Sequence, residues 1–201
     1  MLYFDTLPKI VTNDELGNPI LMTNLLNRAT FLEELQNNPL LYYTYSIQNG
    51  DTPEIVAHKY YEDPYKYWIV LYANQILDPL WDWPMDDSVF SQYLIEKYGT
   101  YAYTQTTVHS YEKITTTKDL ISDVVTTNYN TITFEQYSAL TPSTTTYNTD
   151  DPISVSVSIG KRIVYVFDYE YELNESKREI KLLNSAFVYR MEQQFKELMS
   201  Q

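Results

Sequence analysis

The chain has 201 residues, of which 44% are hydrophobic and 20% are charged, so a sizeable core can be buried and wholesale disorder is not expected. Fourteen basic residues against 27 acidic ones leave a net charge of −13, which disfavours binding to nucleic acid or to anionic membranes. Cysteine is absent, which excludes disulfides, thiolate metal sites and cysteine nucleophiles.

The first 22 residues have no helical periodicity and no signal-peptide pattern. Residues 13–19 contain Gly17 and Pro19 and predict a turn, so we expect an extended arm that becomes ordered against other chains. No apolar run in the sequence approaches the length of a membrane span. We therefore expect a soluble protein that is made in a cytoplasm and is not exported through a cleaved signal.

A helix is predicted next, with Thr23 as its N-cap and Asn37-Asn38-Pro39 as its end. Its apolar positions recur at helical spacing, as expected for a helix that packs through one face: Leu25, Leu26, Ala29, Leu32 and Leu35.

A strand, two helices and a final strand are predicted between Leu40 and Met85. Residues 40–47 are rich in tyrosine and aliphatic side chains, which favours a strand. Thr52-Pro53 and Asp63-Pro64 each combine a capping residue with a proline suited to the first helical position. The second helix, through about Ala73, is apolar on nearly every face, so Trp68 is predicted to be packed. A short closing strand is predicted within residues 82–85.

This order, with Gly50-Asp51-Thr52 opening the first helix, resembles the LysM domain over about residues 43–85. The closing loop departs from the LysM pattern, because it has no glycine and carries two tryptophans. The usual LysM task is binding N-acetylglucosamine polymers such as peptidoglycan. In this chain that task would use the loops Gln48–Pro53 and Ile76–Trp83.

Residues 86–173 are predicted to form a helix, from Asp86-Asp87-Ser88 to Tyr98, followed by a threonine- and tyrosine-rich antiparallel β region. Apolar residues alternate along 153–159 and again along 163–171, which predicts two strands. The second strand would carry an acidic row, Asp168, Glu170 and Glu172, on its solvated face. The topology of residues 100–160 stays open.

The C-terminal segment is predicted as a short strand over 178–183 and a last helix that begins at Asn184-Ser185. The alternative is one continuous helix from Glu175. The apolar face of the last helix is Val188, Met191, Phe195 and Leu198. The predicted fold class is therefore α+β: an N-terminal arm and helix (1–39), a LysM-like βααβ module (40–85), a helix with the β region (86–173), and a short strand with the C-terminal helix (174–201).

The whole layout resembles the LysM-containing baseplate wedge subunit of T4-like contractile-tailed phages, the gene product fifty-three family. The resemblance rests on residues 45–57, Tyr60-Tyr61, Tyr67-Trp68 and residues 78–83, with the N-terminal arm and the 178–183 segment before the last helix. It implies a structural protein of the virion that contacts other wedge subunits and neighbouring copies and helps to join wedges during tail assembly. The alternative function is that of a peptidoglycan-binding LysM protein.

An enzyme is not expected. The adjacent pairs Asp86-Asp87 and Asp150-Asp151 do not face one substrate from a helix or a strand. His58 and His109 form no His-x-x-x-His pair, so no zinc site is predicted. Serine elbows, phosphate-binding loops and dinucleotide motifs are absent from the sequence. We therefore predict no catalytic residue, no cofactor and no metal.

Twenty-one tyrosines beside only four glycines favour an assembly surface, because tyrosine offers a large amphipathic contact area. The predicted anchors of a partner interface are Trp81, Trp83, Phe187 and Phe195, with the partner supplying lysine or arginine at the rim. The alternative for both tryptophans is that they close the core of the module itself.

Overall fold

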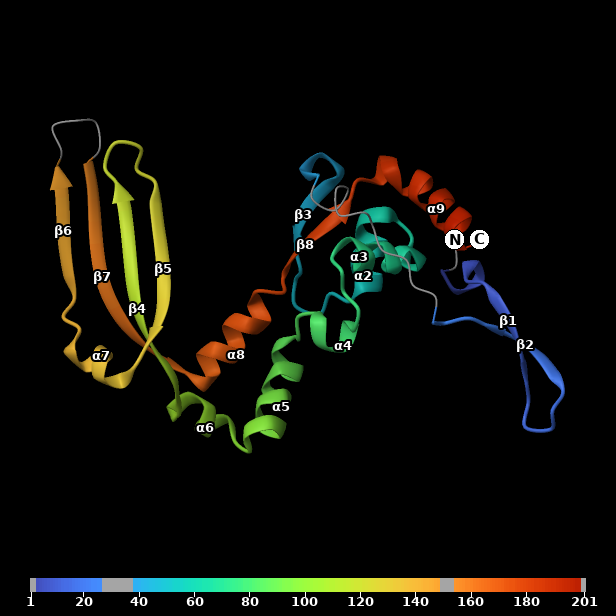
Figure 1. Ribbon diagram of the computed structural model, residues 1–201, viewed down its shortest axis with the longest axis horizontal. Helices are drawn as coiled ribbons and strands as arrows, with labels where there is room; N and C mark the ends of the chain where they lie inside the picture. Colours follow the sequence, from blue (N-terminus) through green and yellow to red (C-terminus); the bar gives the residue numbers. More distant parts are fainter. Residues whose placement is uncertain (1–2, 27–37, 149–153, 200–201) are drawn as a thin grey trace. The chain divides into compact units, whose positions relative to one another are not determined.

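The computed structural model describes residues 3–26, 38–148 and 154–199. The chain divides into two compact units (Figure 1). Unit 1 comprises Met1–Asp87 and Asn174–Gln201, and unit 2 comprises Ser88–Leu173. Helices and small antiparallel sheets occur together, so the α+β class is confirmed.

Unit 1 begins with the 3₁₀ helix η1 (Tyr3–Thr6) and an antiparallel hairpin of β1 (Lys9–Asn13) and β2 (Pro19–Thr23). The predicted turn is confirmed: the Asp14 carboxylate accepts the N–H groups of Leu16 and Asn18, and Gly17 has a φ of 83°. Thr23 is the last residue of β2, so its prediction as a helix N-cap is wrong. Most of the helix predicted after it lies outside the described residues, and Leu25 and Leu26 form a turn.

The segment from residue 40 to residue 85 is entered through η2 (Pro39–Leu41) and begins with β3 (Tyr42–Ser46), which confirms a strand within residues 40–47. Its partner is β8 (Glu179–Leu183), antiparallel in a register from Tyr42↔Leu183 to Ser46↔Glu179. The predicted closing strand within residues 82–85 is therefore wrong. Asp82 ends the short helix α4 (Pro79–Asp82), and Pro84 has no N–H group to donate to a ladder.

Two helices follow β3 as predicted: α2 (Pro53–Tyr61), and α3 (Tyr67–Ala73) behind the 3₁₀ turn η3 (Pro64–Lys66). The Thr52 hydroxyl accepts the Ile55 N–H, and the Asp63 carboxylate accepts the Tyr65 N–H. Glu62 between them is left-handed, with a φ of 59°, so no continuous helix crosses this point. Local capping thus accounts for the helical pair.

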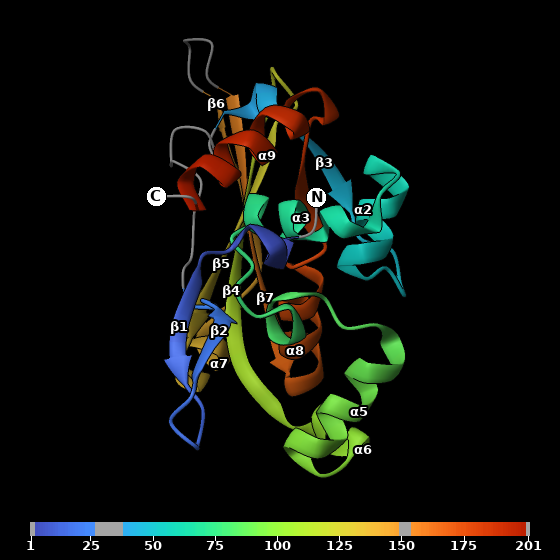
Figure 2. The same cartoon turned by 90° about the vertical axis from the view of Figure 1, so that its right-hand side faces the viewer.

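The C-terminal helix α9 (Ser185–Met199) begins after Asn184, whose side chain accepts the Ala186 N–H. Because β8 precedes it, the alternative of one helix from Glu175 is excluded. Figures 1 and 2 show α9 near α3, and the Phe195 ring lies 4.9 Å from the Trp68 ring. The core of unit 1 is built from α2, α3, β8 and α9, with Leu7, Ile47 and Trp83 completing it. Leu198, predicted on the apolar face, is exposed, whereas Met199 is buried.

Unit 2 contains a four-stranded antiparallel sheet in the order β5-β4-β7-β6 (Figure 1). The helix predicted up to Tyr98 is confirmed and is followed by Gly99 at a φ of 89°. Two short helices were not predicted, although Thr100 and the capping box of Thr133 with Gln136 are the local signals for them. The elements in chain order are α5 (Asp87–Tyr98), α6 (Tyr101–Thr106), β4 (Val108–Asp119), β5 (Val125–Ile132), α7 (Phe134–Ala139), β6 (Ser143–Asn148), β7 (Ser154–Tyr165) and α8 (Val166–Glu175).

The second predicted strand, over residues 163–171, is confirmed only up to Tyr165, where β7 ends, and is wrong beyond it, because α8 begins at Val166. Residues two apart point to different sides of a helix, so the acidic row does not exist as one face. Asp168 instead accepts the Tyr165 N–H in the first turn of α8, and Glu170 is buried. Phe167 and Tyr171, one helical turn apart, stack with ring centres 5.8 Å apart.

Candidate partner interface

The loop around α4 holds large apolar side chains at the surface of unit 1. Asp78 caps α4 by accepting the Leu80 N–H, and the Asp82 carboxylate accepts the N–H groups of Leu77 and Asp78. The Lys177 ammonium donates to the Trp81 carbonyl from the segment before β8. Trp81 is 59% exposed, and Leu77 and Leu80 are still more exposed. The loop thus presents three exposed apolar side chains on a backbone that is held by hydrogen bonds.

Trp83, two residues further on, is only 7% exposed. Its indole N–H donates to the Asp51 carbonyl at 2.7 Å and so ties the loop to the start of α2. The two tryptophans therefore lie in different environments. Trp83 belongs to the core of unit 1, and Trp81 remains accessible to a partner.

The Asp51 carboxylate is the polar centre beside Trp83. It accepts hydrogen bonds from the Tyr45 hydroxyl at 2.7 Å, the Gln48 N–H at 3.1 Å and the Lys59 ammonium at 2.6 Å. Burial by itself would raise its pKa, but these donors outweigh burial and hold the pKa of Asp51 below its usual range. The Gly50-Asp51-Thr52 turn is thereby fixed, and the carboxylate has a structural role.

The other two predicted anchors lie on α9. Phe195 is buried and stacks on Tyr3, with ring centres 5.4 Å apart. Phe187 is 37% exposed and lines a mainly apolar hollow of about 210 Å³. The other residues around this hollow are Leu41, Tyr42, Leu183, Arg190, Met191 and Gln194. Trp81 and Phe187 are thus the accessible members of the predicted set, and an interface through them stays a prediction.

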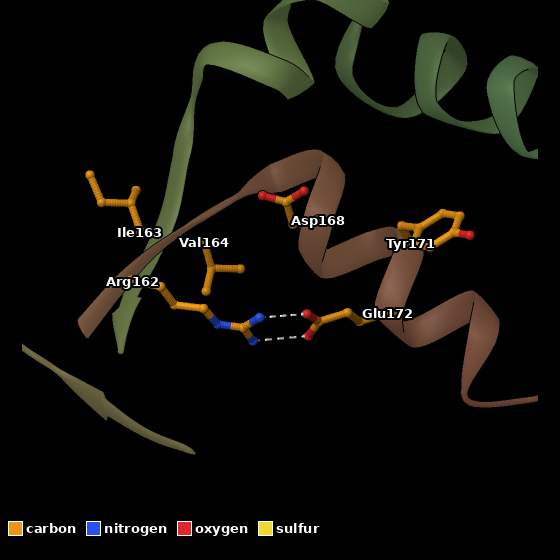
Figure 3. A pocket seen from close by; sticks show the side chains of 6 residues that line it. All are labelled: Arg162, Ile163, Val164, Asp168, Tyr171 and Glu172. Carbon is orange, nitrogen blue, oxygen red and sulfur yellow. Dashed lines mark hydrogen bonds and ion pairs between the residues drawn. The ribbon is translucent and has the colours of Figure 1, made fainter. Parts of the chain in front are cut away.

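Unit 2 has a polar hollow of about 280 Å³ between the end of β7 and α8 (Figure 3). The Arg162 guanidinium donates to Glu112 at 2.7 Å and to both oxygens of Glu172 at 2.9 and 3.3 Å. It also lies over the Tyr129 ring, 4.7 Å from its centre. Burial would lower the pKa of Arg162, but the two carboxylates raise it. Two carboxylates already bind this arginine, so it is not free to bind an anion in the hollow. Its ion pairs join β4, β7 and α8.

Glu170, predicted on a solvated strand face, is a buried carboxylate of unit 2. It accepts hydrogen bonds from Lys97 at 2.8 Å, Tyr98 at 2.6 Å and Tyr93 at 3.2 Å, so α8 is joined to α5. Burial acts to raise its pKa, yet the Lys97 ammonium and the tyrosine hydroxyls lower it below the usual range. The group is fully engaged in holding two helices together.

The remaining candidates for chemistry are dispersed. Asp87 accepts a hydrogen bond from the Asn49 amide, and Asp150-Asp151 lies outside the described residues. His58 lies within α2, and His109 stacks on Tyr169 with ring centres 3.9 Å apart. Among the residues that the structure describes, no three acidic, histidine or cysteine side chains converge as metal ligands. In the same ranges, no helix is both long and apolar enough to cross a membrane.

The polar clusters described above are thus structural ion pairs, and the accessible candidates for binding are exposed apolar side chains. A family model described as base plate wedge protein 53 matches residues 3–197, nearly the whole chain. The chain belongs to the base plate wedge protein 53 family. No curated protein matches it. As a member of this family, the chain is a structural protein of the phage baseplate, a component of the virion tail that interacts with other baseplate subunits.

Proposed function

We propose that this chain is a wedge subunit that contacts other wedge subunits and helps to join neighbouring wedges during assembly of a contractile tail. The observation that carries the proposal is the α4 loop, where Leu77, Leu80 and Trp81 are exposed while capping hydrogen bonds order the backbone. Exposed apolar groups on an ordered backbone are typical of interface anchors, since binding costs little conformational entropy.

Charge near this loop indicates the chemistry of its partner. Residues 74–87 contain four aspartates and no lysine or arginine, and the basic side chain that contacts the loop from outside this range is Lys177. A second copy of the same surface would repel the first, whereas basic side chains at the rim of another subunit would attract it. We therefore propose that Trp81 enters an apolar pocket of a different subunit and that lysine or arginine surrounds this pocket.

The LysM-like part of the chain serves protein contacts in this proposal. Trp83, which could stack on a sugar ring if it were exposed, is buried, and its indole N–H binds the Asp51 carbonyl, which joins the two loops that a glycan would use. We expect the purified chain to remain in solution when peptidoglycan is pelleted. Co-sedimentation that is competed by N-acetylglucosamine oligomers would favour a glycan-binding function instead.

The experiment that tests the proposal compares Trp81→Ala with Trp83→Ala. We expect Trp83→Ala to lower the free energy of unfolding by about 3–5 kcal/mol, the usual cost of truncating a buried aromatic residue. We expect Trp81→Ala to change it by less than about 0.5 kcal/mol, because its side chain is mostly exposed. The measurements are urea unfolding and incorporation into wedges prepared without this chain.

Incorporation decides between the two roles of Trp81. The proposal expects Trp81→Ala to fold normally and to lose at least about tenfold in incorporation, as for the loss of a hot-spot tryptophan. Leu40→Ala, also strongly exposed in unit 1 but outside the α4 loop, is the matched control and should incorporate like the unmodified chain. Normal incorporation of Trp81→Ala would show that the α4 loop is not the anchor.

A further inference from the structure

The β1–β2 hairpin is apolar on both of its faces. Residues directly opposite each other in an antiparallel pair share a face, and successive residues alternate between faces. Ile10 pairs with Met22, and Ile20 lies on the same face. Val11 pairs with Leu21 on the opposite face. These five side chains are exposed by 39% (Ile20) to 70% (Val11).

Such a ribbon is unusual for a chain surface. A sheet that packs through one face alternates apolar with polar residues, so that its other face can meet water. A two-stranded hairpin alone is only marginally stable in water. Within the described ranges, β1 and β2 pair with each other and with no further strand (Figures 1 and 2). The two apolar faces therefore indicate a ribbon that becomes covered on both sides in an assembly.

The charge of the hairpin indicates what covers it. The turn carries Asp14 and Glu15 beside Leu16, which is 87% exposed. Lys9, at the end of β1 away from the turn, is the one basic residue among residues 9–23. Another copy of this chain has a net charge of −13 and would repel the acidic tip of the hairpin. A different subunit with basic groups around the tip is the complementary one.

We propose that the β1–β2 hairpin inserts into a slot of another baseplate subunit, with apolar walls against both faces of the ribbon and lysine or arginine at the end that receives Asp14 and Glu15. The inference rests on the proposed function, because it takes the partner to be a baseplate subunit. It adds the mode of contact, which is a ribbon enclosed on both sides and not a surface patch.

The test uses two paired variants of the full chain, one for each face: Ile10→Thr with Met22→Thr, and Val11→Thr with Leu21→Thr. Threonine removes apolar contact area but retains a high preference for strands. The probe is a preparation of wedges that lack this chain, from the phage that encodes it. Both paired variants should lose at least about tenfold in incorporation, while the urea midpoint of the free chain stays unchanged. Lys9→Thr is the matched control on the same strand and should incorporate normally.

Other results would overturn the proposal in distinguishable ways. A loss of incorporation in only one of the two paired variants would mean that the hairpin contacts its partner through one face only. A lowered urea midpoint in either pair would mean that the hairpin packs on its own chain. Normal incorporation of both paired variants would contradict a slot with apolar walls. An equal loss of incorporation in Lys9→Thr would contradict it as well. In each case the proposed function survives if the unmodified chain still joins the wedges, and it fails only if that chain does not.

A charge reversal at the tip tests the basic end of the slot. Glu15→Lys should slow incorporation at low salt by about tenfold and should have a smaller effect at high salt, where charges are screened. Faster incorporation would show that the receiving surface is acidic and would overturn the assignment. Dimerisation of the free chain, detected by sedimentation and abolished by the paired variants, would identify a second copy as the partner instead.

Discussion

Replacing Trp68 with alanine is expected to lower the free energy of unfolding of unit 1 by about 3–5 kcal/mol, the usual cost of deleting a large aromatic side chain from a packed core. Trp68 is fully buried, and the centre of its ring lies 4.9 Å from the ring centre of Phe195, 5.7 Å from that of Tyr3 and 6.0 Å from that of Tyr72. The substitution would therefore remove the contact that joins α3, α9 and η1. All three tryptophans of the chain lie in unit 1, so their fluorescence during urea unfolding reports on this unit.

Two variants control this measurement. Trp68→Phe should cost clearly less than the alanine variant, because it retains an aromatic ring and the buried Trp68 N–H has no hydrogen-bond partner among the described residues. Trp81→Ala removes an equally large side chain from an exposed position. A loss below about 1 kcal/mol for Trp68→Ala would contradict a core position for this residue.

The second large effect concerns the buried carboxylate of unit 2. Lys97→Met should lower the free energy of unfolding at pH 7 by about 2 kcal/mol, because it leaves the Glu170 charge buried without its cation. The full cost of breaking a buried pair is larger, but the Lys97 side chain is 45% exposed and solvent screens part of the interaction. Unit 2 contains no tryptophan, so far-ultraviolet circular dichroism is the appropriate signal.

The stability difference between Lys97→Met and the unmodified chain should depend on pH through the charge of Glu170. The folded-state pKa of Glu170 is lowered, so the carboxylate contributes stability above its unfolded pKa of about 4.3 and loses it as the pH falls through the lower folded value. Without Lys97 the Glu170 pKa should rise, so the gap between the variant and the unmodified chain should narrow between about pH 5 and pH 3. Glu170→Gln retains hydrogen-bonding capacity without the charge. Its free energy of unfolding should therefore depend less on pH between about pH 5 and pH 3. A gap that stays constant across this range would show that Lys97 acts through packing alone.

Much of the local structure was determined by the sequence itself. Thr52-Pro53 and Asp63-Pro64 predicted the starts of two helical segments, because the signals for capping lie within a few residues of each helix start. Asn184 and the apolar spacing behind it likewise predicted α9. The family resemblance likewise rests on short motifs, which are concentrated in residues 45–83 and accompanied by the N-terminal arm and the 178–183 segment.

Tertiary structure decided what pairs with what. The partner of β3 is β8, more than 130 residues away. The sequence predicted strands both around Pro84 and over 178–183, but no local pattern states which of them pairs with β3. The alternation along 163–171 was compatible with a strand, yet the chain turns helical at Val166, where Phe167 and Tyr171 pack at helical spacing beside Phe90. Short apolar runs leave that choice to long-range packing.

The candidate interface divides in the same way. Sequence alone could mark Trp81 and Trp83 as notable but could not separate them, since both follow the same loop and both aromatic rings favour burial. The tertiary structure separates them, because the backbone carbonyl of Asp51 accepts the Trp83 indole N–H and Trp83 is buried, whereas Trp81 lies within α4 and is exposed. Glu170 became a buried ion-pair partner for a related reason: helical spacing placed its carboxylate beside Lys97 and Tyr98, whose positions no sequence neighbour of Glu170 specifies.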